Sequence, residues 1–247
     1  MRYLAKSAAP SIPFMLVVFL FLNCPEGSLA SPPSKRVQSA IAAPPQALAP
    51  DKGKFRDKVN GKQVGTEEFE ISPDGGGWAA RATAVIKGDN GPSTRITSLL
   101  RLRADGTPVH YEWSTEGPKK ASAKIDFDNG TATIQLQIAG KSPFTQQLMF
   151  KTPRVAILDD NLYHQYAILA ALYDWSKRGP RDISVLIPQE LTPGSVTVEA
   201  LDPEDSGGKM FSRLRVHSQD LELTLYFDGN KLVRISVPSA NAEIERE

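Results

Sequence analysis

The sequence predicts a mostly β domain in which a curved antiparallel sheet or half-barrel of short meandering strands wraps one long buried helix at about residues 160–177. Polar and apolar residues alternate along most of the chain after Lys54, as in strands with one buried face. Turn signals separate these segments at intervals of about 8 to 12 residues, which is typical of a meander that closes toward a sandwich or barrel. The segment Leu158–Lys177 is instead apolar on nearly every side, so we expect a buried helix there.

Residues 1–30 have the features of an export signal. Arg2 and Lys6 give a positive start, Phe14–Leu22 is an unbroken apolar run, and Ser28–Ala30 is a small-x-small cleavage site. The apolar run is too short to cross a bilayer core of about 30 Å. We expect cleavage after Ala30 and an exported protein, periplasmic or secreted, with no integral membrane span once the signal is removed.

Cys24 is the only cysteine and lies just after the apolar run. A lipid-anchored precursor would place its acylated cysteine there. Asn23 precedes it where such sites have a small residue, so ordinary cleavage is favoured over a lipoprotein. After cleavage at Ala30 the chain has no disulfide, and packing alone must hold the fold.

The rest of the chain divides into a linker and one domain. Residues 31–54 are rich in Pro, Ala and Ser and show neither strand nor helix periodicity, which is typical of a linker. Residues 55–247 are predicted to form a single β-rich domain. Within it, Ala121–Asp128 and Thr131–Ile138 alternate on both sides of Asn129-Gly130, which predicts a hairpin with a tight turn.

The charge balance narrows the partners. The chain has 29 basic and 28 acidic residues; removal of residues 1–30 takes away Arg2, Lys6 and Glu26, which leaves 27 of each. A balanced chain lacks the clustered positive charge of nucleic-acid-binding proteins. It also lacks the basic excess that holds a protein to anionic lipid. We therefore expect no nucleic-acid partner, and the sequence leaves any protein partner unidentified.

The predicted helix begins at Asp159 or Asp160, whose carboxylate would cap the first backbone N–H groups, and stops before Gly179-Pro180. Several strands carry small residues where a core usually has Val, Ile or Leu: Ala80, Ala82, Ala84, Ala121, Ala123 and Ala132. If these line the inner face, the aromatic side chains of the helix must occupy the space they leave. Either they fill it completely, or helix and sheet leave a cleft for an apolar ligand. Alternation alone does not decide between these interpretations.

Some elements of the chain resemble a bacterial exported family of unknown function. They are "VNGKQVGTEEFEI", "LDDNLYHQYAILAALYDW", "VLIPQE" and the C-terminal "LYFDGNKLVRISVPSANAEIERE". The resemblance covers about residues 55–247. It implies a fold similar to the lipoprotein-carrier (LolA/LolB-like) half-barrel, and the same domain precedes secreted α/β-hydrolases. The resemblance offers no catalytic residues. It implies that the domain can bind a lipid-like ligand.

The chain shows no signature of catalysis. It has no G-x-S-x-G elbow, no H-E-x-x-H and no phosphate-binding glycine loop. His110 and Glu112 share one strand face but no third metal ligand is placed beside them, and His217 lies among arginines. We expect no metal, no cofactor and no enzyme activity.

The leading hypothesis is a non-catalytic exported domain that binds or carries an apolar molecule between sheet and helix. The alternatives are a structural or protein-interaction domain of the cell envelope with a filled core and, third, an unrecognised hydrolase that uses His164. The candidate ligand-binding residues are Tyr163, His164, Tyr166, Tyr173, Trp175, Trp78 and Trp113.

Overall fold

The computed structural model describes residues 47–88 and 91–247, which belong to one compact unit of residues 39–247. The predicted signal peptide and Cys24 lie outside the described residues. The strands of the first half are β1 (Asp51–Val59), β2 (Lys62–Asp74), β3 (Gly77–Ile86), β4 (Thr94–Leu102), β5 (Pro108–Glu116), β6 (Ala121–Asp128), β7 (Thr131–Ile138) and β8 (Phe144–Met149).

The second half of the chain contains the helices and the remaining strands. In order they are β9 (Val155–Ile157), α1 (Gln165–Leu172), the 3-10 helix η1 (Trp175–Lys177), β10 (Arg181–Ile187), β11 (Thr192–Ser206), β12 (Lys209–His217), β13 (Glu222–Asp228), β14 (Lys231–Val237), the 3-10 helix η2 (Pro238–Ala240) and β15 (Ala242–Arg246). The predicted mostly β class is therefore confirmed.

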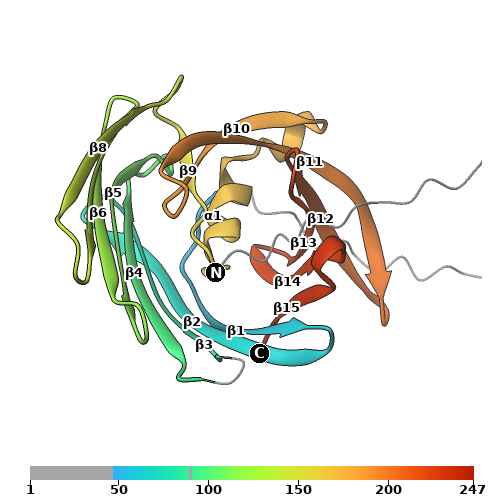
Figure 1. Cartoon of the computed structure of the whole chain (residues 1–247). Helices are drawn as coiled ribbons and strands as arrows, with labels where there is room; N and C mark the ends of the chain where they lie inside the picture. The colour runs from blue at the N-terminus through green and yellow to red at the C-terminus, as the bar shows by residue number, and fades with distance from the viewer. Residues whose placement is uncertain (1–46, 89–90) are drawn as a thin grey trace, which may run out of the picture. The chain divides into compact units, whose positions relative to one another are not determined.

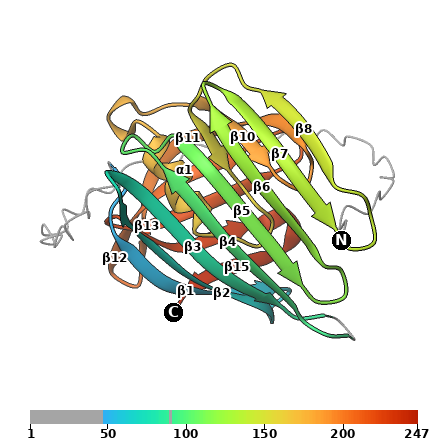
Figure 2. The same ribbon diagram turned by 90° about the vertical axis from the view of Figure 1, so that its left-hand side faces the viewer.

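The fifteen strands form one sheet in the order β8-β7-β6-β5-β4-β3-β2-β1-β15-β14-β13-β12-β11-β10-β9. The sheet curves round α1, which lies on its concave side (Figure 1). Strands β3 to β8 run side by side as one broad face, called here the β3–β8 wall (Figure 2). The predicted curved sheet is confirmed.

The sequence predicts an antiparallel sheet, but one pair of strands in the structure is parallel. Strand β9 pairs in parallel with β10, with Ala156 opposite Val185, and α1 lies in the connection between them. A parallel pair needs such a crossover, because a two-residue turn cannot return the chain to the same end of the sheet. The three residues of β9 are too few to show a period of two, so the alternation pattern misses this strand.

The turns follow the predicted chemistry. Asn129 and Gly130 have φ values of 44° and 84°, and the flanking strands pair from Asp128–Thr131 to Ala121–Ile138. Two consecutive positive φ values match the twist of the strands that such a turn connects. The hairpin over residues 121–138 is confirmed.

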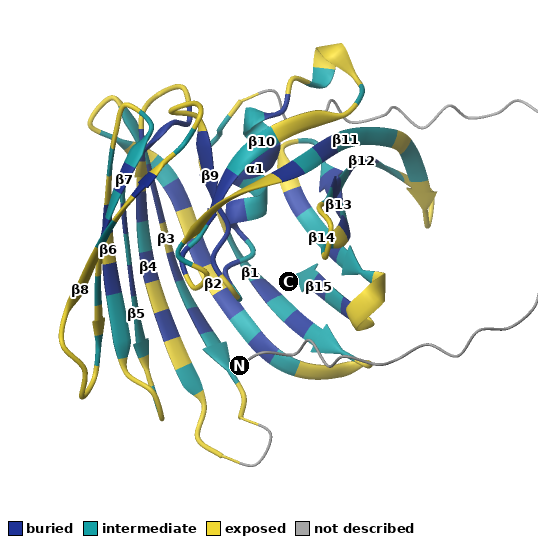
Figure 3. Cartoon of the chain, turned by 45° about the horizontal axis from the view of Figure 1, so that its top comes forward, coloured by how far each residue is buried: buried dark blue, intermediate teal, exposed yellow. Residues whose placement is uncertain are grey.

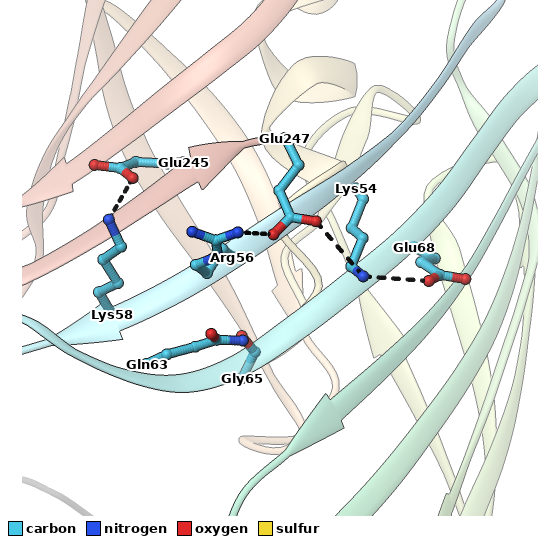
Figure 4. A network of polar contacts seen from close by, with 8 residues as sticks. All are labelled: Lys54, Arg56, Lys58, Gln63, Gly65, Glu68, Glu245 and Glu247. Carbon is cyan, nitrogen blue, oxygen red and sulfur yellow. Dashed lines mark hydrogen bonds and ion pairs between the residues drawn. The ribbon is translucent and has the colours of Figure 1, made fainter.

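The two ends of the domain are joined by pairing of β1 with β15, in which Phe55 faces Arg246. On one face of this pair, alternating charges bridge the strands (Figure 4). Lys58 Nζ lies 2.5 Å from Glu245 Oε2, and Arg56 pairs with Glu247. Strand β1 begins at Asp51, so it includes the last residues of the predicted linker 31–54.

The buried core lies between the concave face and α1, and buried positions alternate with exposed ones along the strands of the wall (Figure 3). The small residues of the predicted inner face are on that side. Those that are buried are Ala80, Ala82, Ala84, Ala123 and Ala132, and Ala121 is partly buried.

The prediction of one long helix over residues 160–177 is wrong. Helix α1 has eight residues, Gln165–Leu172, and η1 follows it after a break at Tyr173, where ψ is 133°. Its start is delayed because Asn161 is in the left-handed region, with φ 66°, and because the backbone N–H groups of Tyr163 and His164 donate to Glu67 on β2. These bonds satisfy the donors that a helix start leaves unpaired.

Candidate functional site

The start of α1 is anchored by Glu67 from the concave face of β2. Glu67 Oε2 accepts the backbone N–H groups of Tyr163 at 2.8 Å and His164 at 3.2 Å, and Glu67 Oε1 lies 2.6 Å from His164 Nδ1. Both side chains are fully buried. A carboxylate from a distant strand thus binds the two residues that directly precede α1.

Next to this pair, Tyr163 and His164 make further contacts with β1 and β2. The Tyr163 hydroxyl donates to Asp57 Oδ2 at 2.8 Å. The His164 ring stacks on Phe69, with ring centroids 5.8 Å apart. His164 Nε2 is buried and has no hydrogen-bond partner among the described residues.

Asp159 is the centre of a second buried network. Its carboxylate accepts from the Tyr111 hydroxyl on β5 and from Gln189 Nε2 in the turn between β10 and β11. The backbone N–H of Asp159 donates to Gln165 Oε1 at 2.6 Å, and Gln165 Nε2 donates to the Tyr111 oxygen at 3.4 Å. These bonds connect the wall, the helix and the β10–β11 turn, so the prediction that Asp159 caps the helix is wrong.

Burial controls the ionisation of these groups. It raises the pKa of Asp159 to about 6, although Tyr111 and Gln189 donate to the carboxylate. Burial, followed by the Asp57 charge, holds the pKa of Tyr163 well above its usual value. Burial also raises the pKa of Tyr166 to about 12, with a smaller contribution from Asp160. Both tyrosines therefore stay neutral at physiological pH, and Tyr163 acts as a hydrogen-bond donor.

The aromatic residues after α1 are also part of the framework. The Tyr173 hydroxyl donates to the Gly179 carbonyl at 2.8 Å and accepts the N–H groups of Gly179 and Ala200, each at 3.1 Å. Trp175 packs edge-on against Tyr173 and Phe227. Trp175 Nε1 donates to the Ala170 carbonyl at the end of α1. These side chains close the helix end.

The two remaining candidates lie on the concave face of the wall. Trp78 is on β3, four positions from Ala82, and Ala82 pairs with Ser98, which pairs with Trp113. At about 3.3 Å per residue, the rows of Trp78 and Trp113 are roughly 13 Å apart. Of the seven predicted residues, five thus lie in or around α1, and Trp78 and Trp113 lie apart on the concave face. The five are Tyr163, His164, Tyr166, Tyr173 and Trp175.

A separate row of residues crosses the wall at Trp113. Register pairs connect Ser98, Trp113, Ala123, Leu136 and Phe144, all on the concave face. Exposure is low at Trp113 (8%) and Ala123 (4%) and higher toward β8, where Leu136 is partly buried and Phe144 is 46% exposed. Along this row the concave apolar surface is therefore covered at β5 and β6 and open toward the edge strand β8.

Two buried polar atoms in this row have no partner among the described residues, Ser98 Oγ and Trp113 Nε1. A buried donor without a partner costs free energy. Ser98 and Trp113 are direct cross-strand neighbours, so the two atoms belong to the same part of the wall.

The wall carries two shallow hollows of about 330 and 280 Å³. The first is lined by the buried residues Ser98, Trp113 and Ala123 and by their neighbours along the strands, among them the exposed Thr97 and Lys124 and the partly buried Glu112. His110 lies nearby, with Nδ1 2.7 Å from Asp126 Oδ1 and Nε2 3.8 Å from Glu112 Oε2. Within the described ranges, no group of three or more His, Cys, Asp or Glu residues is arranged to hold a metal ion.

The sequence analysis misses five polar members of the buried networks: Asp57, Glu67, Tyr111, Gln165 and Gln189. For Glu67 a signal was present. It alternates with Thr66, Glu68 and Glu70 and shares its face with Phe69 and Ile71, so the pattern places a carboxylate on an apolar face. Such a carboxylate requires donors, but the pattern does not identify them.

No family model and no curated protein matches the sequence. Two solved structures are similar to this chain. One is a β-barrel-like protein of the domain of unknown function DUF1849 from Brucella abortus, with a TM-score of 0.55 and 10% identity, covering 81% of this chain and 96% of that one. The other is a duf1089 family protein from Pseudomonas aeruginosa, with a TM-score of 0.48 and 11% identity, covering 72% of this chain and 91% of that one.

The first of these likenesses shows a β-barrel-like fold. The resemblance to the lipoprotein-carrier half-barrel and the export of the chain stay predictions. No helix in the described part of the chain has the length and apolar character needed to cross a membrane.

Proposed function

We propose that this chain is a non-catalytic, exported binding domain that holds an apolar, lipid-like molecule on the concave face of β5 to β8. The observation that carries the proposal is the row from Trp113 through Ala123 and Leu136 to Phe144, an apolar surface that opens toward β8. Ile138, paired with Ala121, widens it by one more partly exposed position.

The polar atoms of the row indicate which end of the ligand lies deepest. Trp113 Nε1 is a donor only, and a serine hydroxyl both donates and accepts. A carbonyl or ester oxygen at the head of an acyl chain matches both atoms. The chain itself would lie along Ala123, Leu136 and Phe144, where burial contributes on the order of 25 cal/mol per Å² of apolar surface.

In this arrangement the ligand lies away from the tyrosines of the helix region, where the sequence analysis expects it. The hydroxyls of Tyr163 and Tyr173 are bound within the framework. A ligand between α1 and the sheet would have to break those bonds. Trp113 remains the predicted residue that contacts the ligand.

The test is titration of the delipidated full chain with a dansyl-labelled fatty acid. Leu136→Glu introduces a charge on the concave face and should weaken binding at least about tenfold, which corresponds to a loss of about 1.4 kcal/mol. Gln135→Glu is the matched control, because Gln135 is the exposed preceding residue on the opposite face of β7. Equal affinity of both variants would rule out the concave site.

A structural or protein-interaction domain with a filled core is the second candidate. It is favoured by the continuous buried cluster that joins α1 to β9, β10 and the C-terminal strands. Under this alternative, the wild-type chain leaves the fluorescence of the probe unchanged. Mass spectrometry of the protein isolated from its native envelope would test export and ligand together, by giving the mature N-terminus and any lipid carried with it.

A further inference from the structure

The two edge strands of the sheet differ in accessibility. The three residues of β9 are each 2% exposed, and β9 lies beside α1 and β5. Strand β8 lies at the opposite edge of the sheet, and Phe144 and Met149, at its two ends, are 46% and 82% exposed. An exposed edge is a template for pairing with another strand.

The hydrogen-bonding phase of β8 shows which backbone groups are free. The Phe150 N–H donates to the Gly130 carbonyl at 2.7 Å, and the register from Thr131–Met149 to Leu136–Phe144 is unbroken. In an antiparallel ladder every second residue bonds the same neighbour. Residues 144, 146 and 148 therefore bond to β7, and the N–H and C=O groups of Thr145, Gln147 and Met149 point away from the sheet.

Nothing in the described residues pairs with those groups. Strand β11 and the β10–β11 turn come close to β8, and in that turn the Leu191 carbonyl accepts from Gln146 Nε2 at 3.4 Å. The Gln146 side chain points to the concave side, so this turn lies beneath β8 and not along its edge. The side chains of Thr145, Gln147 and Met149 are exposed.

Strand β8 also lacks the features that usually protect an edge. Its sequence, FTQQLM, contains no charge and no proline, and its pairing contains no bulge. Charged residues, prolines and bulges are the common means of preventing edge-to-edge pairing. Lysine and proline appear only on its flanks, at Lys141, Pro143, Lys151 and Pro153.

We propose that β8 is a homodimer interface, at which it pairs antiparallel with β8 of a second copy about a two-fold axis through Gln147. In this register Gln147 faces Gln147, and Thr145 faces Met149 of the second copy. Every free backbone group then meets a free group, which gives about six hydrogen bonds. The interface is isologous, as in most closed dimers.

The flanking residues agree with this register and with this partner. Phe144 faces the second copy's Phe150, which adds a cross-strand aromatic pair. Lys151 faces the second copy's Pro143 and Lys141 its Pro153, so no lysine lies opposite a lysine. A shift by two residues would place Pro143, which has no N–H, or Lys151 in the hydrogen-bonded ladder. The uncharged strand thus complements its own copy best in one register.

Sedimentation velocity of the full chain from about 1 to 100 μM tests the dimer. Gln147→Pro removes an edge N–H that the monomer does not use, and proline is tolerated on edge strands. This variant should keep the monomer's circular dichroism spectrum and lose the dimer. A wild-type chain that stays monomeric throughout, or a Gln147→Pro variant that dimerises like wild type, would overturn the proposal.

Charge tests the register. Gln147→Lys places two like charges opposite each other and should weaken the dimer about fivefold. An equimolar mixture with Gln147→Glu should restore it as a heterodimer. Gln135→Lys adds the same charge on β7, away from the edge, and should leave the dimer unchanged. Failure of the mixture to recover would contradict an axis at Gln147.

Thiol cross-linking gives a second readout in a Cys24→Ser background. Gln147→Cys alone should form a covalent dimer with a short bismaleimide. Thr145→Cys should cross-link with Met149→Cys and not with itself, because two Thr145 positions lie roughly 13 Å apart in this register. Efficient self-cross-linking of Thr145→Cys would exclude this pairing.

Discussion

The polar atoms buried at the start of α1 and those buried on the β3–β8 wall differ in whether they have partners. Glu67 accepts two backbone N–H groups and contacts the His164 ring, and Asp159 accepts from two side chains. Among the described residues of that region, only His164 Nε2 lacks a partner. On the wall, neither Ser98 Oγ nor Trp113 Nε1 has one.

The bonded groups at the start of α1 fix the fold, whereas Ser98 and Trp113 on the wall keep hydrogen-bonding capacity that no described residue uses. A buried carboxylate must be surrounded by donors, so the segment before α1 has one permitted position relative to β2 and β5. The row of Ser98, Trp113 and Ala123 on the wall contains no carboxylate and imposes no such constraint. The contrast predicts large effects of substitutions near α1 and small or opposite effects on the wall.

The largest effect is expected for Glu67→Ala. It removes the acceptor of two backbone N–H groups and of His164, and leaves them buried. The free energy of unfolding should fall by about 3–5 kcal/mol, seen in urea denaturation as a lower midpoint with an unchanged slope. Glu68→Ala, on the exposed face of the same strand, should change it by less than about 1 kcal/mol. Similar values for both would show that Glu67 does not anchor the helix.

Asp159 should produce the next effect, in the pH dependence of stability. Its pKa is raised to about 6 by burial, above the unfolded value of about 3.9, so the folded state binds the extra proton. This contribution is fully present below about pH 4 and is lost as pH rises through 6. The loss amounts to at most about 3 kcal/mol.

Asp159→Asn removes this dependence. The difference in unfolding free energy between wild type and variant should therefore change between pH 4 and pH 7, in favour of the variant as pH rises. Asp128→Asn, at the exposed end of β6, serves as the control for removal of one carboxylate. A difference that is constant over this range would contradict a raised pKa at Asp159.

Tyr163→Phe should have a smaller effect. It leaves Asp57 Oδ2 without the hydroxyl that donates to it at 2.8 Å and preserves the packing of the ring. The expected loss is about 1–2 kcal/mol. Asp57→Asn should recover part of it, because the neutral amide is less costly to leave buried; a double variant no more stable than Tyr163→Phe would contradict this.

The features predicted correctly from the sequence are those set by local sterics. The faces of the wall follow from the period of two, and the turn at Asn129-Gly130 follows from residues that accept positive φ. The predicted extent of the helix was wrong because its start depends on Glu67, which lies 97 residues before His164 in the chain. No local pattern carries that information.

The same limit applies to the candidate site. The apolar composition of residues 158–177 identified a buried segment, but not that its tyrosine hydroxyls are bound to β1 and to the loop after η1. Alternation placed Trp113 on the inner face. It did not show that the exposure of this face increases toward β8, because exposure depends on how far the opposite elements reach over the wall.

The smallest effect, and one of opposite sign, is expected for Ser98→Ala. The substitution removes a buried hydroxyl without a described partner and leaves a side chain of similar volume, so the free energy of unfolding should stay constant or rise by up to about 1 kcal/mol. Ser122→Ala, on the other face of β6, should change it by no more than about 0.5 kcal/mol. A loss above 1 kcal/mol for Ser98→Ala would show that the hydroxyl is already bound, and the contrast between helix and wall would fail. If it is bound by a ligand instead, the same variant weakens binding of the fluorescent fatty acid while the unliganded chain keeps its stability, since only the complex uses that hydrogen bond.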